Sequence, residues 1–158
     1  MDRTPTGRLT LLARAAFAGV AVLVFAADRV SKNLVVALVS PGTEVQVFPH
    51  LWITNTHNSG AAFSIAPNAT LLLLVASVVV AAGLVWYVLR NQVQPATAAL
   101  LGMVLGGTAG NGYDRLVQGS VPDFIAVHFW PVFNLADAAI SVGVVLLVIG
   151  YLLRRRPD

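Results

Sequence analysis

An apolar stretch at residues 69–89 constrains this chain more than any other feature, because it holds 21 residues without a charge. About 20 such residues in a helix cross the roughly 30 Å hydrocarbon core of a bilayer. Further spans are predicted at about residues 15–27, 96–112 and 132–153. Only 11% of the residues are charged, compared with roughly 25% in an ordinary globular domain. The 158 residues therefore predict a single-domain, all-α membrane protein with four transmembrane helices.

The positions of the basic residues predict the orientation, because cytoplasmic loops carry the excess of lysine and arginine. Seven of the ten basic residues fall on one side of the predicted spans: Arg3, Arg8, Arg14, Arg90, Arg154, Arg155 and Arg156. Both termini are therefore predicted to be cytoplasmic, with outer loops at residues 28–68 and 114–131. Partial alternation of apolar and polar residues predicts a small extracytoplasmic β-sheet between the first two helices.

Several classes of function fit the composition poorly. The basic residues gather at helix ends instead of forming a stripe with interleaved aromatics, which argues against nucleic acid as a partner. The chain has no cysteine, so disulfides and thiolate nucleophiles are excluded. His50, His57 and His128 show no recognisable metal-ligand spacing. We therefore expect no metal and no cofactor, and a nucleophile that is an oxygen or a water.

Asp137 is the most informative single residue, because it lies inside an otherwise apolar segment. A buried acid there costs roughly 2.5 to 3.5 kcal/mol on insertion scales, so it should face protein or a water-filled cavity. Asp123 lies upstream in the outer loop that returns to the same segment. Two carboxylates in a low-dielectric site cannot both ionise cheaply, and one protonated and one ionised acid suit peptide hydrolysis. One structural and one solvated aspartate is an open alternative.

Polar residues at two other helix ends are candidates for support. Asp28 and Lys32 are four residues apart, so they share a face and can pair if the first helix continues past residue 27. Asn111, Asp114 and Arg115 cluster where the third helix meets the outer loop, which is typical of a buried network that fixes a loop.

Asn58 and Gly60 end the predicted sheet region. Asn58 could orient a substrate or a catalytic aspartate, and Gly60 permits close backbone approach. An ordinary Asn-Ser-Gly turn is the alternative at these residues.

The sequence leaves two functions other than hydrolysis open. A transporter or channel subunit could use Asp28, Asp114 and Asp137 as an ion path, but the polar residues gather at the predicted outer ends of the spans and not through the full membrane depth. A scaffold or assembly factor would suit the small residues of the third span. A buried acid with no obvious structural partner argues against the scaffold.

Five blocks of residues, in order, resemble motifs of the lipoprotein signal peptidase (signal peptidase II) family. The blocks are Asp28 and Lys32; residues 58–63; Gly110, Asn111, Asp114 and Arg115; residues 119–121 with 123–125; and Phe133, Asn134, Ala136, Asp137 and Ile140. The chain departs from the family pattern at Gly112, Tyr113 and Pro122, where aliphatic residues are common. These departures affect the rigidity of the loops and leave the two aspartates in place.

The resemblance implies a bacterial inner-membrane endopeptidase that removes the signal peptide from prolipoproteins, just before a cysteine that carries diacylglyceryl. It implies a catalytic pair, a set of residues that support the active site and a set with structural roles. The catalytic pair is Asp123 and Asp137; active-site support comes from Asn58, Asn111, Arg115 and Asn134; structural roles fall to Asp28, Lys32, Asp114 and Gly60. Membrane lipid and the cyclic peptide inhibitor globomycin are the further expected partners of a chain that we expect to be monomeric.

Overall fold

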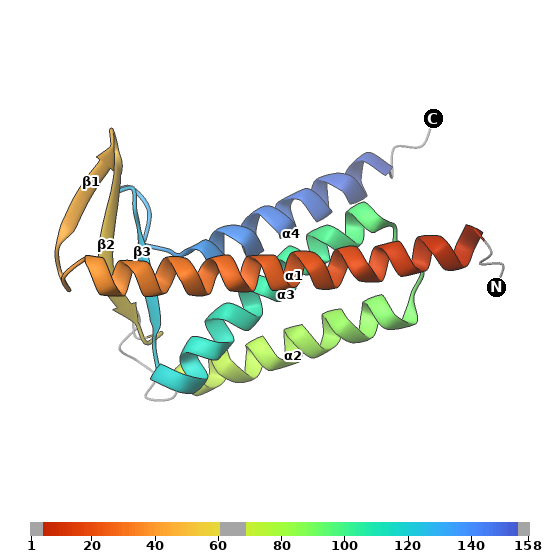
Figure 1. The fold of residues 1–158 in the computed structure, drawn as a ribbon, viewed down its shortest axis with the longest axis horizontal. Coiled ribbons are helices and arrows are strands. Elements are labelled where there is room, and N and C mark those ends of the chain that lie inside the picture. The colour runs from red at the N-terminus through yellow and green to blue at the C-terminus, as the bar shows by residue number, and fades with distance from the viewer. Residues whose placement is uncertain (1–4, 61–68, 155–158) are drawn as a thin grey trace.

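The computed structural model of this chain describes residues 5–60 and 69–154 (Figure 1). Its elements follow in the order α1 (Pro5–Leu38), β1 (Glu44–Phe48), β2 (Leu51–Asn58), α2 (Ala69–Arg90), α3 (Pro95–Gln118), β3 (Val121–Ala126) and α4 (Leu135–Arg154). The helices run along the long axis of the molecule, and the strands lie together at one end (Figure 1). The protein is mostly helical, as the apolar segments predict.

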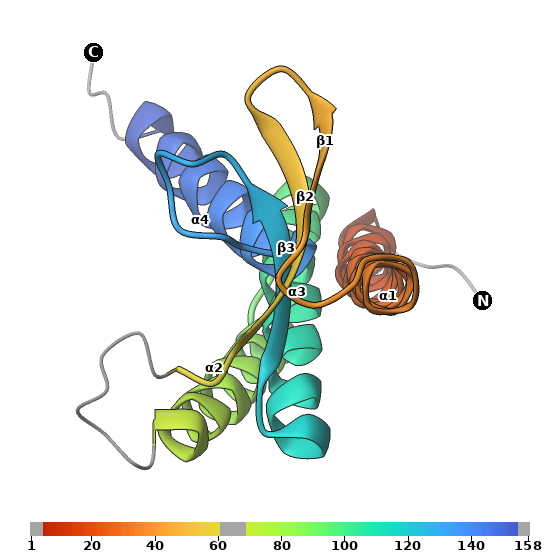
Figure 2. The same ribbon diagram turned by 90° about the vertical axis from the view of Figure 1, so that its left-hand side faces the viewer.

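Three helices among the described residues are long and apolar enough to cross a membrane: Gly7–Leu38, Thr70–Arg90 and Leu135–Arg154. The fourth helix, α3, is not among them, because glycine, threonine and polar residues lower its hydropathy. Viewed from the end with the strands, α1, α2 and α4 surround α3 (Figure 2). The helix with the weakest hydrophobic signal is therefore the central one.

Glycines allow the neighbouring helices to approach α3 closely. A Cβ atom on Gly106 would lie 2.5 Å from the backbone oxygen of Ala21 in α1, and one on Gly107 would lie 2.5 Å from the oxygen of Ala136 in α4. Both distances are far below van der Waals contact. Small residues that admit a neighbouring backbone are the usual basis of helix packing in lipid.

Two helices are longer than the predicted spans, which corrects the predicted loop bounds. α1 continues through residues 28–38 instead of ending near residue 27. Buried partners compensate the charged residues of this segment, and the segment contains no glycine or proline. α3 continues to Gln118, beyond the predicted end at Gly112. Gly119 ends it in a left-handed conformation at φ 71°, with its N–H bonded to the Arg115 oxygen at 3.2 Å.

The sheet also differs from its prediction, because its third strand comes from the other outer segment. β1 and β2 pair as an antiparallel hairpin, and β3 adds to the far side of β2, with Thr56 opposite Asp123. β3 is an edge strand within the sheet, and an edge tolerates Pro122, which has no N–H to donate. Phe133 bridges to Ile125 by N–H···O bonds of 2.8 and 3.1 Å and leads the chain into α4.

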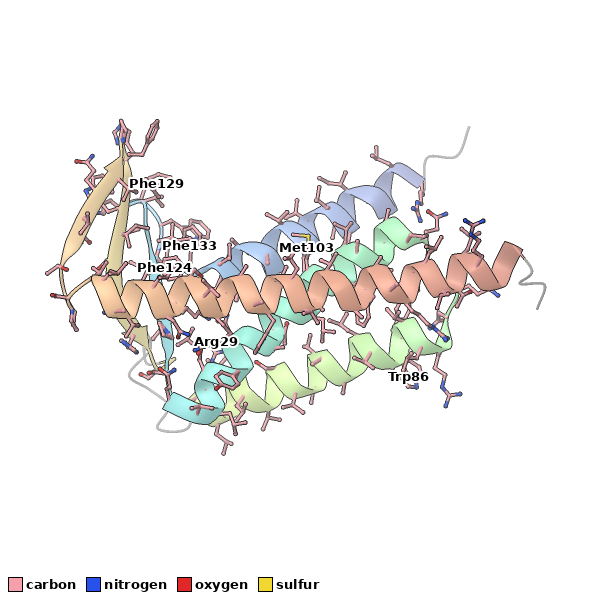
Figure 3. All side chains as sticks on the ribbon, viewed as in Figure 1. Arg29, Trp86, Met103, Phe124, Phe129 and Phe133 are labelled. Carbon is pink, nitrogen blue, oxygen red and sulfur yellow. The ribbon has the colours of Figure 1, made fainter. Side chains whose placement is uncertain are left out.

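The distribution of side chains is the reverse of that in a water-soluble protein. Large apolar side chains cover the outside of the helices, for example Leu72 at 69% exposure. Several of the largest fully buried side chains are polar or charged: Lys32, Asn134, Asp28 and Asp114. Figure 3 shows the apolar side chains projecting from the helix surfaces, with Arg29 where α1 meets α3. This arrangement suits a protein whose surroundings are hydrocarbon.

Candidate active site

Asp123 is held on β3 with its carboxyl group directed at α4. Its side chain is 4% exposed, and the Nδ2 of Asn134 donates a 2.7 Å hydrogen bond to its Oδ1. The hydroxyl of Thr56 donates to the backbone oxygen of Asp123 at 2.9 Å, which fixes this part of β3 against β2. The side chain of Asn58 is a further hydrogen-bond partner of the carboxyl group. A strand, and not the irregular loop that we predicted, therefore positions Asp123.

Asp137 lies in the first turn of α4 and is half-buried. Its Oδ2 accepts a bond from the Asn134 backbone N–H at 3.2 Å, and its own N–H donates to Asn134 Oδ1 at 3.0 Å. These reciprocal bonds form a capping box, in which the N-cap residue and the residue three positions later satisfy each other's N–H groups. The carboxylate therefore sits at a helix N-terminus, where the helix dipole favours negative charge.

Asn111 and Asn134 connect the two carboxyl groups. Asn111, on α3, donates from Nδ2 to Asp137 Oδ1 at 2.8 Å, and its Oδ1 accepts from Asn134 Nδ2 at 3.2 Å. Asn134 also donates to Asp123, so a continuous chain of hydrogen bonds links β3, α4 and α3. The structure thus brings Asp123 and Asp137 to one site.

A buried charge cluster adjoins this site. The ammonium of Lys32 donates to Asp28 Oδ2 at 2.7 Å, to Asp114 Oδ2 at 2.8 Å and to Asn111 Oδ1 at 2.8 Å. Asp28 in turn accepts the backbone N–H of Ala136 in α4 at 3.0 Å. The expected pairing of Asp28 with Lys32 is therefore present, and it joins α1, α3 and α4 directly behind the asparagines.

Two arginines complete the polar interior. Arg29 is ion-paired with Asp114, and its guanidinium lies 4.8 Å from the centre of the Tyr113 ring. Arg115 donates weakly to the Asn111 backbone oxygen at 3.4 Å, and its Nε is buried without a hydrogen-bond partner among the described residues. The carboxylates that interact with the Arg115 charge include Asp137 and Asp123. Arg115 therefore supplies positive charge beside both of them.

Burial raises the pKa of the Asp123 carboxyl above its ordinary value, and the charge of Asp137 acts in the same direction. Hydrogen bonds from Asn134 and Asn58 and the charge of Lys32 oppose this rise in pKa without cancelling it. Burial therefore favours the protonated form of Asp123.

The raised pKa predicts how pH affects stability. Between the ordinary value near 3.8 and the raised value, the folded protein binds more protons at Asp123 than the unfolded chain does, so this group's contribution to stability falls as pH rises. Asp123→Asn does not titrate. In detergent micelles from about pH 4 to about pH 8, we expect the thermal midpoint of the variant to gain on the wild type as pH rises. A constant difference would contradict the raised pKa.

The other predicted residues lie at the edge of the site. Asn58 Oδ1 accepts the Gly60 N–H at 2.8 Å, and Gly60 has a φ of 79°, so the Asn-Ser-Gly turn is present beside the contact with Asp123. The remaining residues of this motif, 61–63, lie outside the described residues. The three histidines are dispersed, and the described residues contain no group of three or more potential metal ligands.

Sequence reasoning missed two contributions to the site. The capping box was readable as Asn-x-x-Asp immediately before an apolar run, which is a helix-start signal. Arg29 gave no comparable signal, because only the packing of α1 on α3 brings it to Asp114.

Comparison with known proteins identifies the family to which this chain is similar. The family model described as Signal peptidase (SPase) II matches residues 20–153. A lipoprotein signal peptidase of Pseudomonas paraeruginosa is 43% identical over 141 residues, covering 82% of this chain and 83% of the relative. One of Mycobacterium avium is 42% identical over 156 residues, covering 94% and 81%.

A solved structure has a similar fold. A bacterial membrane enzyme superposes with a TM-score of 0.78 at 30% identity, covering 87% of this chain and 92% of that one. Together with the apolar helices, this likeness indicates a multi-pass membrane protein. The chain belongs to the signal peptidase II family of peptidases.

Proposed function

We propose that this protein is an aspartic endopeptidase of the membrane that cleaves prolipoproteins just before a diacylglyceryl-modified cysteine. The observation that carries the proposal is the role of Asn134, whose side chain donates to Asp123 and whose backbone N–H donates to Asp137. One residue thus holds two acids of different surroundings at one site. Such a pair suits general acid–base hydrolysis of a peptide bond.

The surroundings of the two carboxyl groups suggest their roles. Asp137 accepts two N–H bonds at a helix N-terminus, and both features stabilise a carboxylate. We assign it as the base that takes a proton from the attacking water. Asp123, whose pKa is raised by burial, is the acid that donates a hydrogen bond to the scissile carbonyl oxygen. As the amine leaves, Asp137 gives it the proton taken from water, and Asp123 becomes the proton acceptor.

Asn58 and Arg115 are proposed to support the substrate. Asn58 is exposed at the end of β2 while it contacts Asp123. The buried Nε of Arg115 has no partner among the residues described, so a peptide carbonyl could satisfy it. Both residues are placed to orient a peptide backbone over the aspartates.

The proposed placement has four transmembrane helices in a bacterial inner membrane, with α3 as the central span. α1 begins, α2 ends, α3 begins and α4 ends far from the sheet (Figure 1). Four arginines occur in these helices near that end: Arg8, Arg14, Arg90 and Arg154. The positive-inside tendency then places this end and both termini in the cytoplasm, and the sheet with the aspartates near the outer face. We propose one monomeric peptidase domain.

A lipidated substrate suits this placement, because acyl chains that remain in the bilayer deliver the scissile bond to the boundary by diffusion in the plane. The test uses the purified protein reconstituted in lipid vesicles with a prolipoprotein that does or does not carry diacylglyceryl on its cysteine. We expect cleavage of the lipidated form, with a new N-terminus at that cysteine in mass spectrometry, at least about tenfold faster than the unlipidated form.

The same assay contains its own control, since the two substrates share one amino-acid sequence. Globomycin, expected to bind this family's site, should block the cleavage. Equal cleavage of both substrates would remove the lipid from the proposed specificity, and no cleavage of either would overturn the proposed function.

A further inference from the structure

Lys32 has a contact that a purely structural ion pair does not require. Its ammonium is 1% exposed and donates three hydrogen bonds. Asp28 and Asp114 together balance the charges of Lys32 and Arg29, so charge balance does not require a third bond. The third bond goes to the side-chain oxygen of Asn111, which is the residue that donates to Asp137.

This third bond fixes the direction of the Asn111 amide. An ammonium is a donor only, so the group that faces Lys32 must be the oxygen of Asn111. The Nδ2 of Asn134 also faces that oxygen, at 3.2 Å. If the amide were flipped, its NH₂ would oppose two donors, and its oxygen would oppose the carboxylate of Asp137. The unflipped amide satisfies all three neighbours.

We propose that Lys32 is a positioning residue that acts through Asn111, orienting the amide so that its NH₂ group donates to Asp137, the proposed base. The inference rests on the proposed function and deepens it. Lys32 touches neither aspartate of the pair. Its effect on the reaction passes through one rotatable amide.

Other charges lie around Asp137, and their sum must stay constant in a test. They are Asp123 from β3, Arg115 and Asp114 from α3, and Asp28 with Lys32 from α1. Lys32→Met alone leaves Asp28 and Asp114 as buried carboxylates with one cation fewer, so we expect this single variant to be strongly destabilised. Lys32→Met combined with Asp28→Asn removes one charge of each sign. An asparagine at residue 28 can still accept the Ala136 N–H.

The experiment compares three proteins in the prolipoprotein assay: wild type, Asp28→Asn, and the charge-balanced double variant Asp28→Asn with Lys32→Met. We expect the double variant to have a kcat about 10- to 100-fold below that of Asp28→Asn, which is the range for losing a hydrogen bond to a charged group. The KM of the double variant should stay within about threefold of that of Asp28→Asn, because Lys32 contacts neither aspartate of the pair and none of the residues proposed to hold the substrate is changed. A purely structural lysine would lower the folded fraction in thermal unfolding and leave the kcat of the folded protein unchanged.

A cycle with Asn111→Ala tests whether the effect passes through Asn111. When both proteins also carry Asn111→Ala, the kcat of the double variant should differ from that of Asp28→Asn by less than about threefold, because the amide that Lys32 orients is gone. An additive loss, or a double variant whose kcat lies within about threefold of that of Asp28→Asn, would overturn the proposal. Failure of the proposed function looks different, because wild type itself would then leave the prolipoprotein uncleaved.

Discussion

Asp123→Asn and Asp137→Asn are each expected to lower kcat for prolipoprotein cleavage by about 10³-fold or more. An asparagine at residue 137 cannot take a proton from water, and one at residue 123 can neither give a proton to the scissile carbonyl oxygen nor take it back as the amine leaves. Because the proposed binding of the substrate by its lipid and backbone does not depend on the two aspartates, we expect KM to change much less than kcat. The measurement is cleavage of a diacylglyceryl-modified prolipoprotein at saturating substrate.

The two variants should differ in stability although both are inactive. At residue 137 an amide has one oxygen for the two donors, Asn111 Nδ2 and the Asn134 N–H, so one of them faces an NH₂ group and the fold loses about 1–2 kcal/mol. Asp123→Asn removes a carboxyl group that is costly to ionise because it is buried. We therefore expect this variant not to be destabilised at neutral pH.

Glu44→Gln is the matched control for the two aspartates. Glu44 is an exposed carboxylate on β1 that pairs with His128 at 3.0 Å, remote from the asparagine network. Its replacement should leave kcat within about twofold, since exposed pairs contribute little. If either aspartate variant, inserted normally, retains the activity of Glu44→Gln, the assignment of the catalytic pair is wrong.

Gly107→Ala is expected to reduce both stability and activity through one added methyl group. The new Cβ would lie 2.5 Å from the Ala136 backbone oxygen and 2.8 Å from Ile140 Cγ1, so α4 must move away from α3. Overpacking of this kind costs about 1–3 kcal/mol. Asp137 follows Ala136 directly, and a displacement near 1 Å at a reacting group costs about 10²-fold in rate.

Gly83→Ala on α2 is the control for this substitution. A Cβ at residue 83 meets nothing within 4 Å, so the same chemical change should leave activity intact and leave stability unchanged or raised by about 0.5–1 kcal/mol. Thermal unfolding in detergent and the cleavage rate measure both effects. Equal behaviour of the two alanine variants would show that α3 and α4 tolerate separation.

The sequence located the two aspartates because charge in an apolar chain is conspicuous. Asp137 stands alone in its segment, and Asp28 and Lys32 carry the i, i+4 spacing of a helical pair. Placing Asp123 beside Asp137 needed the ordered family motifs. The structure adds what spacing could not contain, namely the two asparagine side chains that join the acids across β3, α3 and α4.

β3 escaped prediction for a physical reason. It is six residues long and includes Pro122 and Asp123, two residue types that are depleted in strands, so no alternation was visible. Its strand geometry comes from pairing with β2, which is distant in the chain. The end of the first helix was predicted wrongly for another reason. Charged residues after residue 27 suggested an exit into water, whereas in α1 Asp28 and Lys32 are buried as an ion pair.

The inverted distribution of side chains has a consequence for how this protein holds together. In hydrocarbon, apolar contact between helices releases no water, so leucine and valine give little reason for α1, α3 and α4 to adhere. Lipid cannot satisfy the hydrogen-bonding groups of the buried polar side chains, so these groups are stabilised most by bonding to one another. They are Lys32, Asp28, Asp114 and Asn134. The polar groups around the proposed catalytic pair thus also hold the helices together. Selection for activity and selection for assembly therefore act on the same few side chains.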